Sequence, residues 1–214
     1  LAAAREAFEE AGVLLAVDEA GNPVETAGVA WVEAARLAVN KGEQSFRALL
    51  AEHGLRVDTS GCRYFARWVT PSTEPRRFDA RFFLARTPAG QEARPDASGE
   101  VVDFRWDRPQ AFLDMQTRGE IKLPPPTLWH LTDLARFATV DEALAWAKRD
   151  EVIIVRPKLW SFDGAIVIVL PWDPDYAGID VPESEPLPMS SPVAGPVTRY
   201  VLDEDGLWIP KQVK

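Results

Sequence analysis

The chain has 214 residues, of which 46% are apolar and 27% charged, which is ordinary for a soluble globular protein. Its formal net charge of −9 disfavours a nucleic-acid partner, because proteins that bind a phosphate backbone usually carry a basic patch. The longest apolar run, Ala165 to Leu170, is far shorter than the roughly 20 residues that a membrane span needs, so we expect no membrane partner and a cytoplasmic location.

The residue pattern of the N-terminal part predicts three helices and one short strand. Apolar residues at helical spacing predict a helix from Leu1 to Leu15, and Gly12 is a candidate stop. A short buried strand is expected from Val13 to Val17. Two further helices are expected between Val29 and His53, broken at Asn40-Lys41-Gly42.

The middle of the chain alternates strand and helix signals. Aromatic and β-branched runs predict strands at 64–69, 78–86 and 100–106. Proline or threonine at a first turn predicts helices at 109–118, from Thr127 to about Phe137, and at 141–149 with Thr139 as its cap.

After Asp150 the sequence pattern changes to short strand signals and a stretch rich in proline and acidic residues. Strands are expected at 152–155 and 165–170, and a final hairpin around Asp205-Gly206. Trp160, Trp172 and Trp208 fall in this part and are expected either to anchor it to the rest or to form a subunit interface.

Cys62 is the single cysteine, so the chain cannot form an internal disulfide. A nucleophilic role would need a neighbouring histidine, and no motif supports one. We therefore interpret Cys62 as structural.

Three carboxylates, Glu6, Glu9 and Glu10, share one face of the first predicted helix, because residues three and four apart are neighbours on a helix. They repel one another unless a positive group lies among them, and carboxylate oxygens are natural ligands of Mg²⁺. Arg5 is placed to brace one of them. A solvated acidic face without metal is the alternative, and spacing alone leaves it open.

The order Arg5-Glu6-Ala7-Phe8-Glu9-Glu10-Ala11-Gly12-Val13 resembles the second half of the Nudix box, R-E-apolar-x-E-E-x-G-apolar, at every defined position. The resemblance implies that Glu6, Glu9 and Glu10 bind Mg²⁺ or Mn²⁺. It also implies that Glu6 is a ligand or the water-activating base and that Arg5 orients the cluster.

The first half of the box, with its glycines and first glutamate, does not precede these residues. We expect a missing N-terminal segment, or another chain, to supply it. The implied fold is α+β, an α/β/α Nudix sandwich with a mixed β-sheet flanked by helices. We expect a Nudix domain at 1–150 with a helical insertion at about 27–55, and a C-terminal β extension at 151–214.

Downstream segments resemble the Nudix branch that includes the mammalian peroxisomal coenzyme A diphosphatase. These segments are Trp68 to Pro71, Pro75 to Ala85, an acidic strand before Trp106, and the turn from Leu123 to Thr127. The resemblance spans roughly residues 1 to 140.

Three arginines, Arg76, Arg77 and Arg81, are candidates for binding the substrate phosphates, because a guanidinium fork suits phosphate. Alternation along a strand puts Arg77 and Arg81 on one face with Asp79 between them. An ion-pair network centred on Asp79 is the alternative. Glu100 lies where many Nudix enzymes place an extra catalytic acid, and a plain strand-edge glutamate is its alternative.

The resemblance implies a metal-dependent hydrolase that cleaves a diphosphate in a small nucleotide-type substrate, with coenzyme A or an acyl derivative preferred. ADP-ribose or a dinucleotide is one alternative substrate class, and a non-catalytic binding module is the alternative outside enzymes. A homodimer stays open as the subunit arrangement.

Overall fold

The computed structural model describes residues 1–26, 28–71, 74–94, 105–148, 151–180 and 197–213. The chain divides into two compact units, each built from two stretches of sequence. Unit 1 comprises Leu1–Cys62 and Ala85–Trp106, and unit 2 comprises Arg63–Leu84 and Asp107–Lys214. No described helix is long and apolar enough to cross a membrane.

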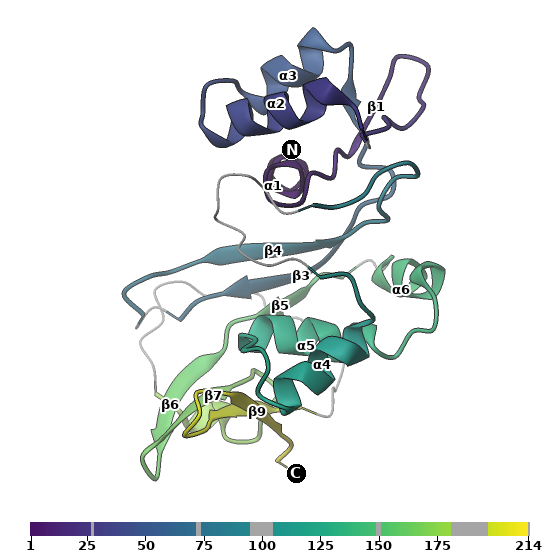
Figure 1. Ribbon diagram of the computed structural model, residues 1–214. Helices are drawn as coiled ribbons and strands as arrows, with labels where there is room; N and C mark the ends of the chain where they lie inside the picture. The colour runs from purple at the N-terminus through teal and green to yellow at the C-terminus, as the bar shows by residue number, and fades with distance from the viewer. Residues whose placement is uncertain (27, 72–73, 95–104, 149–150, 181–196, 214) are drawn as a thin grey trace. The chain divides into compact units, whose positions relative to one another are not determined.

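Unit 1 holds three helices and a two-stranded sheet (Figure 1). The elements are α1 (Ala2–Ala11), β1 (Ala16–Val17), α2 (Ala30–Asn40), α3 (Phe46–Glu52) and β2 (Arg56–Val57), with β1 and β2 antiparallel. Phe8 and Leu14 are fully buried and pack with Val32 of α2 and Leu49 of α3. The apolar stripe predicted on the first helix therefore faces a real core.

Gly12 ends α1. Its φ of 69° lies in the left-handed region, which glycine adopts without steric cost. The amide of Gly12 donates to the Phe8 carbonyl at 3.0 Å, and the amide of Val13 donates to the Ala7 carbonyl at 3.1 Å. These bonds satisfy carbonyls that the last turn of a helix otherwise leaves open.

Unit 2 contains a mixed three-stranded sheet in the order β4-β3-β5. Strand β3 (Arg63–Val69) runs antiparallel to β4 (Asp79–Leu84), and β5 (Ile153–Val155) joins its other edge in parallel. The described part of this unit has the α-helices α4 (Pro109–Thr117), α5 (Pro125–Leu134) and α6 (Val140–Ala147), and a short 3-10 helix, η1 (Tyr176–Gly178). The predicted 151–214 extension thus begins with a strand of the same sheet as β3.

A four-stranded antiparallel sheet completes unit 2, in the order β6-β7-β8-β9. Its strands are β6 (Lys158–Phe162), β7 (Ala165–Val169), β8 (Arg199–Leu202) and β9 (Trp208–Lys211). The turn Asp203–Leu207 between β8 and β9 is the hairpin predicted around Asp205-Gly206.

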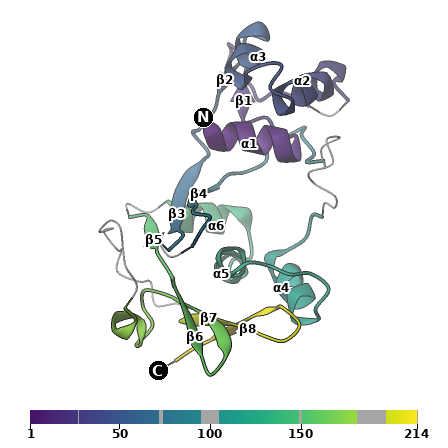
Figure 2. The same ribbon diagram turned by 90° about the vertical axis from the view of Figure 1, so that its left-hand side faces the viewer.

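Helix α5 lies between the two sheets of unit 2 (Figure 2). Leu128 and Trp129 of α5 pack in one cluster with Phe65 of β3 and Tyr200 of β8. The predicted anchoring role is confirmed for Trp172 and Trp208, which pack against this cluster. Trp160, by contrast, is 36% exposed.

His130 of α5 is buried among aromatic rings. Its ring centroid lies 4.2 Å from that of Phe82 and 5.0 Å from that of Phe65. Neither ring nitrogen has a hydrogen-bond partner among the described residues. Burial lowers the pKa of His130 to about 3, so the ring is neutral near neutral pH.

Three expectations about elements were wrong or fall outside the described residues. Helix α5 begins at Pro125 and not after Thr127, because a proline at the first helical position needs no amide donor. Strand β6 was not predicted. Of the expected strand 100–106, only Arg105 and Trp106 are described; they are not in a strand, and Trp106 is 65% exposed.

Candidate metal and diphosphate site

Helix α1 carries the predicted metal-binding carboxylates. Arg5 forms ion pairs with Glu6 and with Glu9, one turn further along the helix. The side chain of Glu9 is 13% exposed and that of Glu6 47%, while Glu10 is exposed. The hydrogen bond to Glu9, strengthened by the charges of Glu9, Glu6 and Glu10, raises the pKa of Arg5. Arg5 is thus the positive group among the carboxylates.

The donor set of α1 fits a hard divalent cation in kind, because all three side chains offer carboxylate oxygens. In the described parts of the chain, however, no three acidic, histidine or cysteine side chains converge closely enough to hold a metal ion. Two of the three carboxylates are turned toward Arg5 instead. Binding a metal on α1 therefore requires these side chains to change rotamer.

The C-terminal end of α1 is held by Arg36, which is 2% exposed on α2. Its Nε donates to the Glu9 carbonyl at 3.0 Å and its Nη2 to the Arg94 carbonyl at 3.0 Å. Asn40 adds a 3.3 Å bond to the Glu9 carbonyl. A cation at the negative end of a helix dipole is also stabilising. Helix α2 thus fixes the backbone under Glu9.

Gln91 fastens the chain that follows α1. Its side-chain oxygen accepts from the Leu14 amide at 2.9 Å, and its amide donates to the carbonyls of Leu14 and Val24. Neither Arg36 nor Gln91 was predicted as a supporting residue, because both act on residues far away in the chain. An arginine at a buried helical position was the only available signal for Arg36.

Asp79 is the centre of an ion-pair network on the β3–β4 sheet, which was the alternative to phosphate binding. Arg67 holds it with two bonds, at 2.7 and 2.9 Å, and Arg81 adds one at 3.2 Å. The hydrogen bonds from Arg67 hold the pKa of the Asp79 carboxyl below its usual range. Arg81 is therefore engaged, although its side chain is still 53% exposed. Arg67 was missed because only strand pairing brings it beside Arg81.

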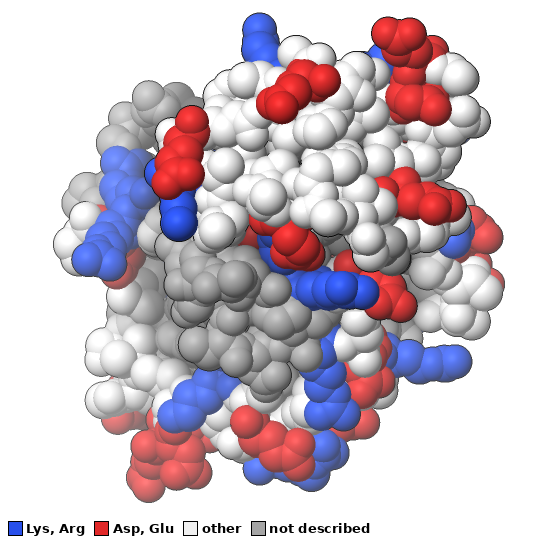
Figure 3. Space-filling model, turned by 45° about the horizontal axis from the view of Figure 1, so that its top comes forward, with Lys and Arg blue, Asp and Glu red and all other residues white. Residues whose placement is uncertain are grey.

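Arg76 and Arg77 are exposed and precede β4, so the expected alternation that put Arg77 on the face of Arg81 does not apply. Glu100 lies outside the described residues. On the face of the molecule drawn in Figure 3, basic and acidic side chains lie close to one another.

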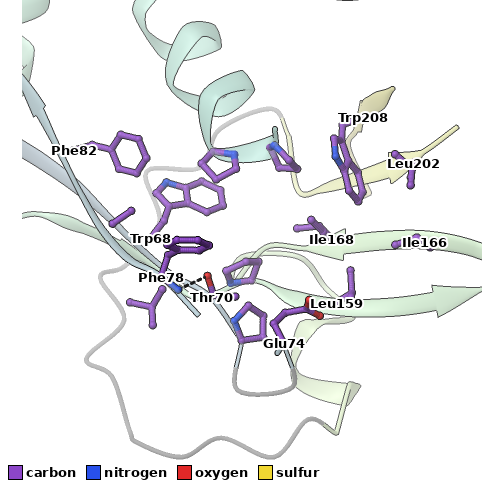
Figure 4. Close-up of a pocket in the computed structure, with 16 residues that line it drawn as sticks. Trp68, Thr70, Glu74, Phe78, Phe82, Leu159, Ile166, Ile168, Leu202 and Trp208 are labelled. Carbon is purple, nitrogen blue, oxygen red and sulfur yellow. Dashed lines mark hydrogen bonds between the residues drawn. The ribbon is translucent and has the colours of Figure 1, made fainter. Parts of the chain in front are cut away.

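A cavity of about 510 Å³ lies within unit 2 (Figure 4). One wall comes from β3, β4 and the segment between them, and includes Trp68, Phe78 and Phe82. The opposite wall comes from the C-terminal sheet and includes Leu159, Ile166 and Ile168. Pro125 and Pro126, at the first turn of α5, also line it.

Comparison with protein families decides the identity of the chain. Residues 1–134, more than half of it, match the model of the NUDT19 Nudix domain. The chain belongs to the Nudix family. The resemblance carried by the segment from Arg5 to Val13 and by the downstream segments is thereby confirmed.

Its relatives include other Nudix proteins. A human protein named acyl-coenzyme A diphosphatase NUDT19 is 32% identical over 151 residues, covering 66% of this chain and 40% of that protein. The Gallus gallus protein of the same name is 28% identical over 207 residues, covering 83% of this chain and 53% of that protein. The chain thus spans about half the length, or less, of these curated relatives.

A solved Nudix structure shares the fold. The NUDIX hydrolase from Alicyclobacillus acidocaldarius superposes with a TM-score of 0.59 at 29% identity, covering 66% of this chain and 63% of that one. The expected α+β fold, with mixed sheet and flanking helices, is confirmed. Proteins of the Nudix family use divalent metal ions. Helix α1, which contains most of the segment that resembles the second half of the Nudix box, is called the box helix below.

Proposed function

We propose that this chain is part of a metal-dependent Nudix hydrolase that cleaves the diphosphate bond of coenzyme A or an acyl-coenzyme A. The observation that carries the proposal is α1, which presents Glu6, Glu9 and Glu10 on a helix whose end is fixed by Gly12 and Arg36. The names of the relatives support the substrate.

The proposed reaction is a hydrolysis at phosphorus. A water oxygen bonds to one phosphorus, the bridging P–O bond breaks, and the products are phosphopantetheine, acylated or not, and adenosine bisphosphate. A bound Mg²⁺ or Mn²⁺ supplies charge neutralisation for the diphosphate and acidifies water. Glu6, Glu9 and Glu10 would hold the metal ion, Glu6 being alternatively the base that would accept the proton of the attacking water, and Arg5 would orient these carboxylates.

Phosphate recognition is proposed for Arg76, Arg77 and Arg81, with Arg81 shared with Asp79. Glu100 is proposed as an additional acid. A cytoplasmic location, a homodimer and an upstream segment that completes the box stay predictions from the sequence.

Substitution of the box carboxylates tests the metal site. We expect Glu9→Gln and Glu10→Gln each to reduce Mg²⁺-dependent product release by more than about 100-fold, since even outer-shell partners of a metal ligand cost 10–100-fold. The matched control is Glu33→Gln, which removes an exposed carboxylate in the first turn of α2. Full activity in both box variants would overturn the assignment.

A substrate panel tests the second half of the proposal. Coenzyme A, ADP-ribose and NADH are compared by kcat/KM with Mg²⁺ and with Mn²⁺ in the same chain. Preference for ADP-ribose or NADH would keep the hydrolase and replace the substrate. Absence of hydrolysis for all three, in a chain extended upstream to complete the box, would favour a binding module.

A further inference from the structure

The cavity of unit 2 is almost entirely apolar. Of its lining residues, only Thr70 and Glu74 have polar side chains apart from the indole of Trp68 and that of Trp208. The hydroxyl oxygen of Thr70 already accepts a hydrogen bond of 3.0 Å from the main-chain amide of Phe78 (Figure 4). A volume of about 510 Å³ is within the range of small-molecule sites.

This lining favours a hydrocarbon chain over a peptide. A peptide segment would bring amide and carbonyl groups, and burying each without a partner costs free energy. A chain of methylenes makes no such demand and gains from every apolar contact. The described walls therefore select against main-chain polar groups.

The β6–β7 hairpin supplies a large part of one wall. One face of β6 and β7 carries the cross-strand pairs Leu159–Ile168 and Ser161–Ile166. The three apolar residues of these pairs, Leu159, Ile166 and Ile168, line the cavity. Leu159 is 37% exposed and Ile166 44%, so this apolar face is only partly covered. The other face of the same strands is buried at Val167 and Val169.

The cavity has cations beside its exposed edge. Phe78 lines the cavity and is 68% exposed, and Arg76 and Arg77 directly precede it in the chain. Glu74 is the only charged residue of the lining, and Asp79, which follows Phe78, is paired with Arg67 and Arg81, so Arg76 and Arg77 are the cations next to this edge. An anionic head group on the ligand complements such an edge.

We propose that this cavity binds a linear acyl chain attached to an anionic head group, and that the β6–β7 hairpin sets how long a chain is preferred. The proposal rests on the proposed function for its link to an acyl-coenzyme A, whereas binding itself stands on the cavity. The source of the chain is either the thioester substrate or a free fatty acid.

A chain-length series tests it without catalysis. Calorimetric titration of the full 214-residue chain in EDTA gives Kd for coenzyme A, for acyl-coenzyme A compounds of increasing length and for the matching free fatty acids. We expect Kd to fall about three- to fourfold per methylene, equivalent to about 0.8 kcal/mol, until the cavity is filled. Dependence in the thioester series alone identifies the substrate as the source, dependence in the fatty-acid series alone identifies the free fatty acid, and equal dependence in both shows that the site recognises the chain whichever head group carries it.

Two variants and a control locate the site. Ile166→Asp puts a charge on the cavity wall and should flatten the dependence on chain length, while Ala80→Leu narrows the cavity and should make Kd level off at shorter chains. Phe162→Asp is the control, because Phe162 is 53% exposed on the opposite face of the same hairpin. Its series should match that of the unchanged protein.

The outcomes separate this proposal from the proposed function. A flat series in the unchanged protein, or an undiminished slope in Ile166→Asp, overturns the acyl site even if coenzyme A is hydrolysed with metal present. A slope that Ile166→Asp removes supports the acyl site even if no diphosphate is cleaved.

Discussion

Helix α1 depends on two arginines that act on different groups. Arg5 pairs with carboxylate side chains, whereas Arg36 donates to the main-chain carbonyl of Glu9. The first contact must loosen for a cation to bind, and the second can persist while it does. The carboxylate side chains can therefore leave Arg5 while Arg36 keeps the backbone at Glu9 in place.

His130 provides a prediction about pH. Its folded pKa of about 3 lies below the unfolded value of about 6.5, so the unfolded state binds more protons as pH falls. The contribution of His130 to stability is complete above pH 6.5 and is lost progressively toward pH 3. Between about pH 7.5 and pH 5 we expect a loss of about 2 kcal/mol in the free energy of unfolding, measured with urea.

His130→Leu is the comparison for this measurement, because leucine does not titrate. The variant should lose much less stability over the same interval, whatever its stability at pH 7.5. Carboxyls with a lowered pKa, such as that of Asp79, change the free energy of unfolding below about pH 4, which lies outside the interval from pH 7.5 to pH 5. Equal losses in both proteins would mean that His130 is not the cause.

At the residue scale, the sequence predicts the chemistry on α1 but not its support. Glu6, Glu9 and Glu10 share a face because helical spacing is local, and Arg5 pairs as expected. Arg36 and Arg67 reach their partners only through tertiary packing or strand pairing, which periodicity does not encode.

The elements were predictable wherever a local signal marks a boundary. Gly12 ends α1, and the side chain of Thr139 accepts from the Glu142 amide at the start of α6. Strand β6 carries lysine and serine beside its apolar residues, which weakens its strand signal, although the Asp163-Gly164 that follows, with both residues at positive φ, is the dipeptide typical of a two-residue hairpin turn. The strand was missed, although it forms part of the cavity wall.

The end of α1 can be tested with two matched glycines. Gly12 and Gly42 have φ of 69° and 70°, but a Cβ on Gly12 would lie 3.1 Å from Arg36 Nη1, while nothing lies within 4 Å at Gly42. We expect Gly42→Ala to cost about 1–2 kcal/mol of unfolding free energy from backbone strain alone. Gly12→Ala should cost more in urea denaturation. Equal costs would show that Arg36 yields without penalty.

The whole molecule is two compact units, and only unit 1 contains the box helix. The predicted boundary between a domain at 1–150 and an extension at 151–214 stays a prediction. The two compact units are a different division of the chain, because each is built from two separate stretches of sequence. Sequence order alone does not reveal such interleaving, because strand pairing between distant segments creates it.

Metal linkage is the prediction at this scale. A cation that binds only the folded chain stabilises it by about 2.7 kcal/mol at 100 times its Kd. Calorimetry should therefore show Tm rising by several degrees with Mg²⁺ or Mn²⁺, and falling back with EDTA. The double variant Glu9→Gln with Glu10→Gln should lose this response, while Glu33→Gln keeps it. An equal rise in the double variant would place the metal elsewhere.

The parallel pairing of β5 with β3 has a consequence for synthesis on the ribosome. Strand β3 emerges early, yet its partner Ile153–Val155 emerges only after all of α4, α5 and α6. Until then one edge of β3 has unpaired main-chain groups, which are a template for aggregation. The β4-β3-β5 sheet therefore cannot be completed until translation has passed residue 155, and pairings so distant in sequence form slowly.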